Sequence, residues 1–223
     1  MRHVAPCCTA SQRLAARSRY PRIVLRHPPP DLAELSMPEL WRRIEAAIDA
    51  LAPSLRTKIA PPATSDEIDA LERSIGRRLP PDYVASLREH AGWLAASSRH
   101  GRLYAQTLVA GFTLLPPAVV LVEREFLEGY ADHDPGWVPV VRHDEDRALY
   151  SCLDLAPSAG ESVGRILSIC TKDPERRVEW SSFRDLLIGE LLVPLERGEL
   201  DLEALEDEGI LAFAEPSSSP HAR

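Results

Sequence analysis

The chain has 223 residues, of which 44% are apolar, enough for one globular domain with a hydrophobic core. Its 34 acidic residues outnumber the 26 basic ones, and the net charge of -8 argues against a general nucleic-acid binder, which usually carries a basic face. The longest apolar runs contain prolines and fall short of the roughly 20 residues that a membrane-spanning helix needs.

The first 36 residues differ from the rest of the chain. They contain six arginines, two acidic residues and a run of three prolines, with no apolar period. Such a composition does not bury enough apolar surface to offset the entropy lost on ordering. We therefore expect residues 1–36 to be a disordered or mis-assigned N-terminal extension, residues 37–214 to form the domain, and residues 215–223 to be a disordered tail.

Capping signals mark the first two helices of the domain. Ser36 and Glu39 have the spacing of a capping box, in which each side chain hydrogen-bonds the backbone of the other residue. Apolar residues then recur at helical spacing until the next proline. Thr64 and Glu67 offer a second capping box, before a helix that should end at Gly76.

The segment RRLPPDYVASLREHAGW, residues 77–93, predicts a short helix with sharp boundaries. Pro80 and Pro81 suit the first helical turn, where backbone N–H groups lack partners. Gly92 is expected at the left-handed position that follows the last turn. Trp93 comes next, and its indole either anchors the core or lies at the rim of a binding surface.

Short strands dominate the second half of the chain. Apolar residues and turn signals predict strands near residues 137–142, 147–155, 164–170 and 177–180. Their short connections favour antiparallel neighbours, and a final helix should begin after Ser182. The order of elements predicts an α+β fold: a single domain with N-terminal helices, a mainly antiparallel sheet of about four to six strands, and a C-terminal helix packed against it.

One cluster of side chains could bind a metal or take part in catalysis. It lies between residues 132 and 146 and consists of Asp132, His133, Asp134, His143, Asp144, Glu145 and Asp146. Imidazole and carboxylate groups together suit zinc, manganese or iron. However, the spacing matches no defined ligand motif, and polar residues also collect at turns for backbone reasons.

Other signals of chemistry are missing from the sequence. The four cysteines show no C-x-x-C spacing, and there is no G-x-S-x-G nucleophile elbow or phosphate-binding glycine motif. We therefore expect no metal, no cofactor and no enzymatic activity. A metal-dependent hydrolase that uses the 132–146 cluster is the remote alternative.

Several segments stand in an order that resembles the SUKH superfamily, in the branch named for the Smi/Knr cell-wall-assembly regulators. They are ELWRRIEAAIDALAP, LPPDYVASLREHAGW, WVPVV, LDLAPSAGESVGRI and VEWSSFRDLLIGEL, and the resemblance covers roughly Met37 to Gly198. The most telling parts are L-P-x-D-Y with its H-x-G ending and the strand that starts at Trp137. The turn HDEDR departs from the Gly-Asp pair common there, so no role passes to it by analogy.

The resemblance implies an α+β fold without established catalysis. Bacterial members are commonly immunity proteins that neutralise toxins, and fungal members are scaffolds in cell-wall signalling. We therefore expect a cytoplasmic protein-binding domain, an immunity protein that blocks a cognate bacterial toxin, with a regulatory or scaffold module as the alternative. An acidic body would attract a basic partner. The candidate contacts are Asp144, Glu145 and Asp146, with Trp93 and Trp137 as aromatic anchors if exposed.

Overall fold

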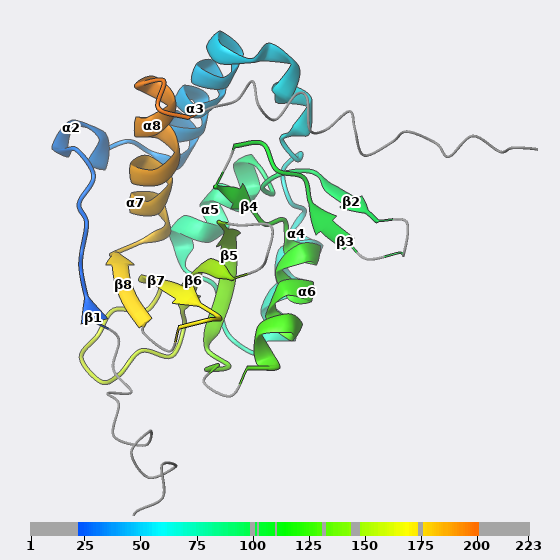
Figure 1. Ribbon diagram of the computed structural model, residues 1–223, viewed down its shortest axis with the longest axis vertical. Coiled ribbons are helices and arrows are strands. Elements are labelled where there is room, and N and C mark those ends of the chain that lie inside the picture. The colour runs from blue at the N-terminus through cyan, green and yellow to red at the C-terminus, as the bar shows by residue number, and fades with distance from the viewer. Residues whose placement is uncertain are drawn as a thin grey trace, which may run out of the picture.

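The structure is a computed structural model that describes residues 22–98, 101, 103–109, 111–130, 133–143, 148–173 and 176–200. In this part of the chain, helices pack on a six-stranded sheet, and a two-stranded hairpin stands beside it (Figure 1). The strand order in the large sheet is β1-β8-β7-β6-β5-β4. All neighbours pair antiparallel except β1 and β8. The expected α+β fold with a mainly antiparallel sheet is thereby confirmed.

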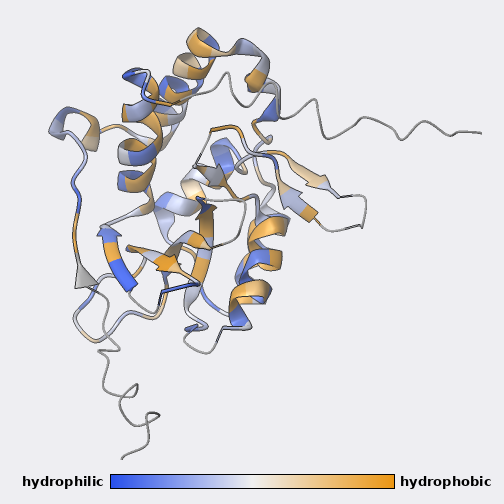
Figure 2. Cartoon of the chain, in the orientation of Figure 1, coloured by the Kyte–Doolittle hydropathy of each residue, from blue (hydrophilic) through white to orange (hydrophobic). Residues whose placement is uncertain are grey.

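The strands are short, and the four central ones match the predicted spans to within two residues. They are β1 (Arg22–Ile23), β4 (Thr113–Leu114), β5 (Trp137–Arg142), β6 (Leu149–Asp154), β7 (Ile166–Cys170) and β8 (Arg176–Trp180), with β2 (Ala95–Ser97) and β3 (Leu103–Ala105) in the hairpin. Figure 2 shows β7 mainly hydrophobic and β8 mainly hydrophilic. The sheet therefore becomes more polar toward its β8 side.

The helices α3, α4, α5 and α7 begin where the sequence signals predict, whereas α2 lies in the segment that was expected to be disordered. They are α2 (Pro30–Ala33), α3 (Met37–Leu51), the 3-10 turn η1 (Pro53–Lys58), α4 (Ser65–Ile75), α5 (Pro81–Glu89), α6 (Pro117–Glu128), and a C-terminal helix in three parts, α7 (Phe183–Leu187), the π-helical segment η2 (Ile188–Leu192) and α8 (Val193–Glu196). The carboxylate of Glu39 accepts the Ser36 N–H at 3.0 Å, and that of Glu67 accepts the Thr64 N–H at 2.7 Å. Both capping boxes are confirmed.

Residues that oppose one another on successive strands form rows across the sheet. The first row lies in the main core with α3, α5 and the C-terminal helix, and consists of Val138, Leu153, Ile166 and Trp180. The next row lies on the opposite face and includes Cys152, Leu167 and Val178, which belong to a smaller apolar cluster. We call these two surfaces the helix-covered face and the second face.

Two shifts in strand register decide which side chains lie on the helix-covered face. On β5 the pairing with β6 passes from Pro139 to Val141, so Val140 has no opposite residue. On β8 the pairing passes from Val178 to Trp180 and leaves out Glu179. Each shift inverts the alternation of the residues beyond it, because side chains change face at every position. Trp180 thereby joins the core.

Residues 22–36 belong to the folded domain, which corrects the expected boundary at Met37. The N–H of Val24 donates to the Val178 carbonyl at 2.9 Å, and that of Arg26 donates to the Glu179 carbonyl at 2.7 Å. Leu32 in α2 is only 4% exposed and lies in the main core. The composition of the segment does not reveal these partners, because they lie far away in the sequence. The expected tail, 215–223, falls outside the described residues.

Gly92 has the expected positive φ, but for a different reason. Helix α5 ends at Glu89, and His90 is its C-cap residue in extended conformation. Gly92 has a φ of 110°, and a Cβ atom there would lie 3.1 Å from the Leu114 carbonyl oxygen. A close approach to β4, rather than the end of the helix, therefore requires glycine at this position.

The packing of residues 22–36 can be tested at Leu32. Leu32→Ala should lower the free energy of unfolding by about 2–3 kcal/mol, because it empties a buried site in the core. Leu25→Ala is the control, since Leu25 is 44% exposed, and should change stability by less than about 0.5 kcal/mol. Urea denaturation measures both. Equal midpoints for the two variants would show that the segment does not pack.

Candidate functional site

The helix-covered face turns polar beyond its first row. The second row on this face consists of Val141, Ser151, Ser168 and Arg177. The third row brings together His143, Leu149 and Cys170. A hollow of about 160 Å³ opens at this point and is lined by Leu149, Ser168, Cys170, Asp173 and Arg177. We call the surface formed by His143, Ser151, Ser168, Arg177 and the adjoining Glu190 the polar face.

His143 ties two parts of the polar face together. Its Nδ1 lies 2.8 Å from the Gly111 carbonyl oxygen, which can only accept, so Nδ1 carries the proton. In the neutral imidazole, Nε2 then accepts a hydrogen bond from the hydroxyl of Ser151, also at 2.8 Å. This is the separation of a nucleophile and its base, but Ser151 is only 2% exposed. A substrate cannot reach the hydroxyl in this conformation, and the contact acts to hold β5 against β6.

The indole of Trp180 sets the position of the C-terminal helix above the polar face. Its ring packs directly on Gly189, where a Cβ atom would overlap the ring carbons. Its Nε1 donates to Glu190 Oε1 at 2.8 Å. Both partners lie in the π-helical segment, a type of irregularity often found at functional sites. The other carboxylate oxygen of Glu190 lies 3.8 Å from His143 Nε2.

Trp137 lies on the second face and is half-buried. The ring of His133 meets it edge-on with centroids 6.0 Å apart, and the guanidinium of Arg176 lies 5.7 Å from its ring centre. His133 Nε2 is buried without a hydrogen-bond partner. Burial lowers the pKa of His133 because it disfavours the charged imidazolium. The site beside Trp137 therefore favours the neutral form of this histidine.

The structure separates the residues that were expected to contact a partner. Trp93 is fully buried; its Nε1 donates to the Phe112 carbonyl at 3.0 Å and its ring meets Trp41 edge-on. Its predicted role as a partner contact is therefore wrong, because large neighbouring residues enclose the indole. Trp137 keeps some exposure and its role stays a prediction. Asp144, Glu145 and Asp146 fall outside the described residues.

The described members of the 132–146 cluster have separate local partners. Asp134 accepts the Gly136 N–H at 2.7 Å, as a turn residue does. His133 lies against Trp137 on the second face, and His143 bonds Ser151 on the helix-covered face. Among the residues that the structure describes, no group of three or more histidine, cysteine or acidic side chains could hold a metal ion. Asp132 and residues 144–146 are not among them.

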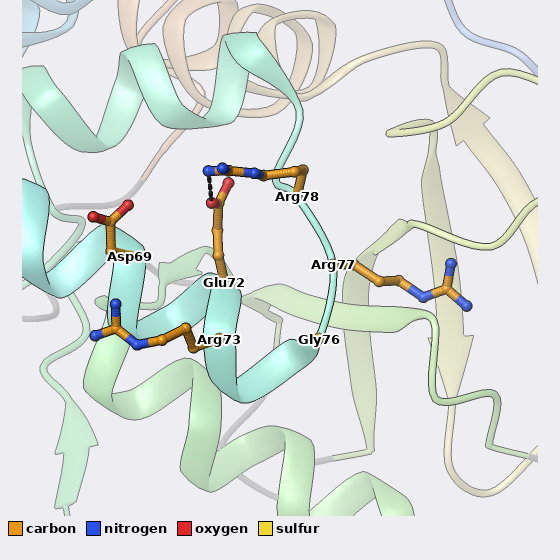
Figure 3. Close-up of a pocket in the computed structure, with 6 residues that line it drawn as sticks. All are labelled: Asp69, Glu72, Arg73, Gly76, Arg77 and Arg78. Carbon is orange, nitrogen blue, oxygen red and sulfur yellow. Dashed lines mark hydrogen bonds and ion pairs between the residues drawn. The ribbon is translucent and has the colours of Figure 1, made fainter.

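A wider hollow of about 450 Å³ lies at the end of α4 (Figure 3). Its lining residues are Asp69, Glu72, Arg73, Gly76, Arg77 and Arg78. The Glu72 carboxylate holds the loop before α5, since it accepts from Arg78 at 2.5 Å and from the Leu79 N–H at 2.9 Å. Figure 3 shows Arg77 directed away from Arg73. The arginines do not converge on one point, as a site for a small anion requires.

The sequence model of the SMI1 / KNR4 family (SUKH-1) matches residues 62–189, more than half of the chain. The chain belongs to the SMI1/KNR4 family. The matched segment includes α4 to α7, the strands β2 to β8 and both register shifts. It therefore contains most of the polar face and ends one residue before Glu190. No curated protein matches the chain. In the part of the SMI1/KNR4 domain that the structure describes, none of the helices has both the length and the apolar character needed to span a bilayer.

Ser151 and Glu190 were missed as site residues. Ser151 stands two positions before Leu153 in a predicted strand, so simple alternation already places both on one face. That signal could have found it. Glu190 offers no comparable signal, because its position over the sheet depends on the π-helical segment and on the packing of Trp180.

The contact between Trp180 and Gly189 can be tested by adding one methyl group. Gly189→Ala should lower the free energy of unfolding by about 1–3 kcal/mol, because the Cβ atom overlaps the indole. Gly129→Ala, at the exposed end of α6, should change it by less than about 0.5 kcal/mol. Thermal or urea unfolding reports both.

A double variant separates this overlap from a general loss of helix stability. Trp180→Phe provides space above residue 189, so Trp180→Phe combined with Gly189→Ala should cost less than the sum of the two single changes. Additive costs, or equal small effects at Gly189 and Gly129, would mean that the indole does not rest on Gly189.

The neutral state of His133 predicts a pH effect on stability. The pKa of His133 is lower in the folded protein than its ordinary value of 6.5. The stability that the neutral histidine contributes is therefore complete above pH 6.5 and is lost as the pH falls through the folded pKa. His133→Phe should therefore flatten the decline of the urea midpoint from about pH 7.5 to about pH 5. His27→Phe, at an exposed histidine, should keep the wild-type profile. Parallel profiles for wild type and His133→Phe would contradict the prediction.

Proposed function

We propose that this member of the SMI1/KNR4 family is an immunity protein that binds a cognate bacterial toxin in the cytoplasm and blocks it by occlusion. Family membership supports a non-catalytic binding or regulatory module. The observation that carries the finer proposal is the partly exposed polar face, which the acidic residues 144–146 follow directly in the sequence. Residues 144–146 follow His143 directly in the chain and lead from β5 into β6.

Acidic groups from other segments lie close to the same place. The Thr171 N–H donates to the Ala148 carbonyl at 2.7 Å, so the β7–β8 connection lies beside the end of the β5–β6 connection. Asp173, in that second connection, lines the hollow. Glu190 approaches His143 from the C-terminal helix. Asp173, beside Arg177 in the hollow, and Glu190 thus lie near the point where the chain continues from His143 into the acidic run at 144–146, and we propose that these carboxylates favour a basic partner.

Such an acidic surface would mainly raise the association rate constant for the toxin. A chain with a net charge of -8 attracts a cationic partner at long range, and complementary charge raises association rates more than it raises affinity. The rigid strands then hold the contact residues in place while the bound domain covers the toxin. Trp137 lies on the second face and keeps some exposure, so its part in the interface stays a prediction.

Charge reversal tests this interface. Changing Asp144, Glu145 and Asp146 to Lys should lower the association rate constant for the toxin by about tenfold or more at low salt and reduce its salt dependence. The matched control reverses Glu34, Asp69 and Glu125, which are exposed elsewhere and alter the net charge equally. The control should have a much smaller effect. Equal slowing in both variants would remove the acidic run from the interface.

The partner itself must first be captured and identified. Affinity capture with the full chain from the native organism, followed by mass spectrometry, should return a toxin domain with a basic surface. The purified toxin should lose its activity when the chain is added in equimolar amount. Capture of a cytoplasmic enzyme that keeps its activity would instead identify a regulatory or scaffold module.

A further inference from the structure

Residues 22–26 form an extended segment, here called the strap, along the edge of β8. The strap runs parallel to β8 and is held by the hydrogen bonds from Val24 and Arg26 to the Val178 and Glu179 carbonyls. Its described apolar side chains bury little surface, since Val24 and Leu25 are both 44% exposed. Among the described contacts, backbone pairing and Arg26 therefore hold the strap in place.

Arg26 occupies a defined place beside β8. Its guanidinium lies 5.8 Å from the ring centre of Trp180, and its NH1 is 3.5 Å from Glu190 Oε1. The Trp180 indole also donates to that carboxylate oxygen. An aromatic face and a carboxylate held in fixed relation make a receptor for a guanidinium group. Because the Arg26 side chain is 55% exposed, this ion pair holds the strap only weakly.

The strap can leave the edge without disturbing the core. The chain after it is anchored independently: Leu32 is buried, and Arg184 NH1 donates to the Ala33 carbonyl at 3.3 Å. The prolines at 28–30 lie between the strap and that anchor and stiffen the connection. Local opening of a segment with few buried contacts costs much less than unfolding of the domain.

We propose that the edge of β8 is a docking site for an extended, arginine-bearing segment of the protein partner, and that the strap occupies this site in the free protein. The partner segment pairs with the Val178 and Glu179 carbonyls, as the strap does, and places an arginine between Trp180 and Glu190. This is strand addition to a sheet edge, with one side-chain pocket supplying specificity. The proposal rests on the proposed function, since it takes the partner to be a basic protein.

A peptide with the strap sequence RIVLRH provides a probe that needs no toxin. Its binding to the full chain is measured by fluorescence anisotropy. In the wild type the tethered strap competes at a high effective concentration, so the peptide should bind weakly. Arg26→Ala in the full chain weakens the tethered strap and should tighten peptide binding by about tenfold. A peptide whose second arginine is replaced by alanine should bind the Arg26→Ala variant no more tightly than it binds the wild type.

The carboxylate is tested in the same background. Glu190→Gln added to Arg26→Ala should return peptide binding to the weak wild-type level, whereas Glu199→Gln, at an exposed residue beyond α8, should not. Equal peptide affinity for wild type and Arg26→Ala, or binding that ignores Glu190, would overturn the proposal. If the Arg26→Ala variant dimerised as its concentration rose, the proposal would also be overturned, because the strap of a second copy would then occupy the β8 edge.

The peptide assay and the toxin assay fail independently. Peptide binding that depends on Glu190 would support the docking site even if charge reversal at 144–146 left toxin association unchanged. Conversely, a toxin whose association ignores Arg26→Ala, but responds to the acidic run, would preserve the proposed function and remove the β8 edge from the interface.

Discussion

The packing of the Trp180 indole on Gly189 determines how the rest of the site is built. The ring reaches the helix-covered face only because the pairing of β8 leaves out Glu179. The absence of a side chain at Gly189 lets the helix backbone approach the ring, and Glu190 then accepts the indole N–H. The C-terminal helix is thereby set over the apolar first row. In the row beyond it Val141 and Ser151 are also buried, whereas Arg177 is exposed at the β8 side, so the polar face is open only in part.

A buried polar cluster on the second face fixes the strand from which His143 extends. Arg142 NH1 lies 3.2 Å from Glu123 Oε1, and the Tyr150 hydroxyl donates to the other oxygen at 2.9 Å. Burial and the adjacent carboxylate raise the pKa of Tyr150. Because Glu123 is fully buried, loss of either partner would leave a charge poorly compensated. The cluster joins α6 to β5 and β6, so the polar face has a rigid support.

Much of the fold was predictable from local patterns, because capping boxes and strand alternation act over a few residues. The spans of α3 and β5 follow from such signals. The packing of residues 22–36 was not predictable, since β1 finds its partner in β8, far away in the chain. The site shows the same division. Simple alternation from Val138 puts His143 on the second face, and only the register shift after Pro139, which depends on pairing with β6, places it beside Ser151.

Both margins of the large sheet end in strands of only two residues, β1 on one side and β4 on the other. Long, flat, apolar edges invite identical molecules to pair and aggregate. When the strap leaves, the edge that appears belongs to β8, whose sequence RRVEW carries three charged residues among five. Charged side chains on an edge strand disfavour pairing between identical molecules. The protein can therefore expose hydrogen-bonding groups to a different chain at little risk to its own solubility.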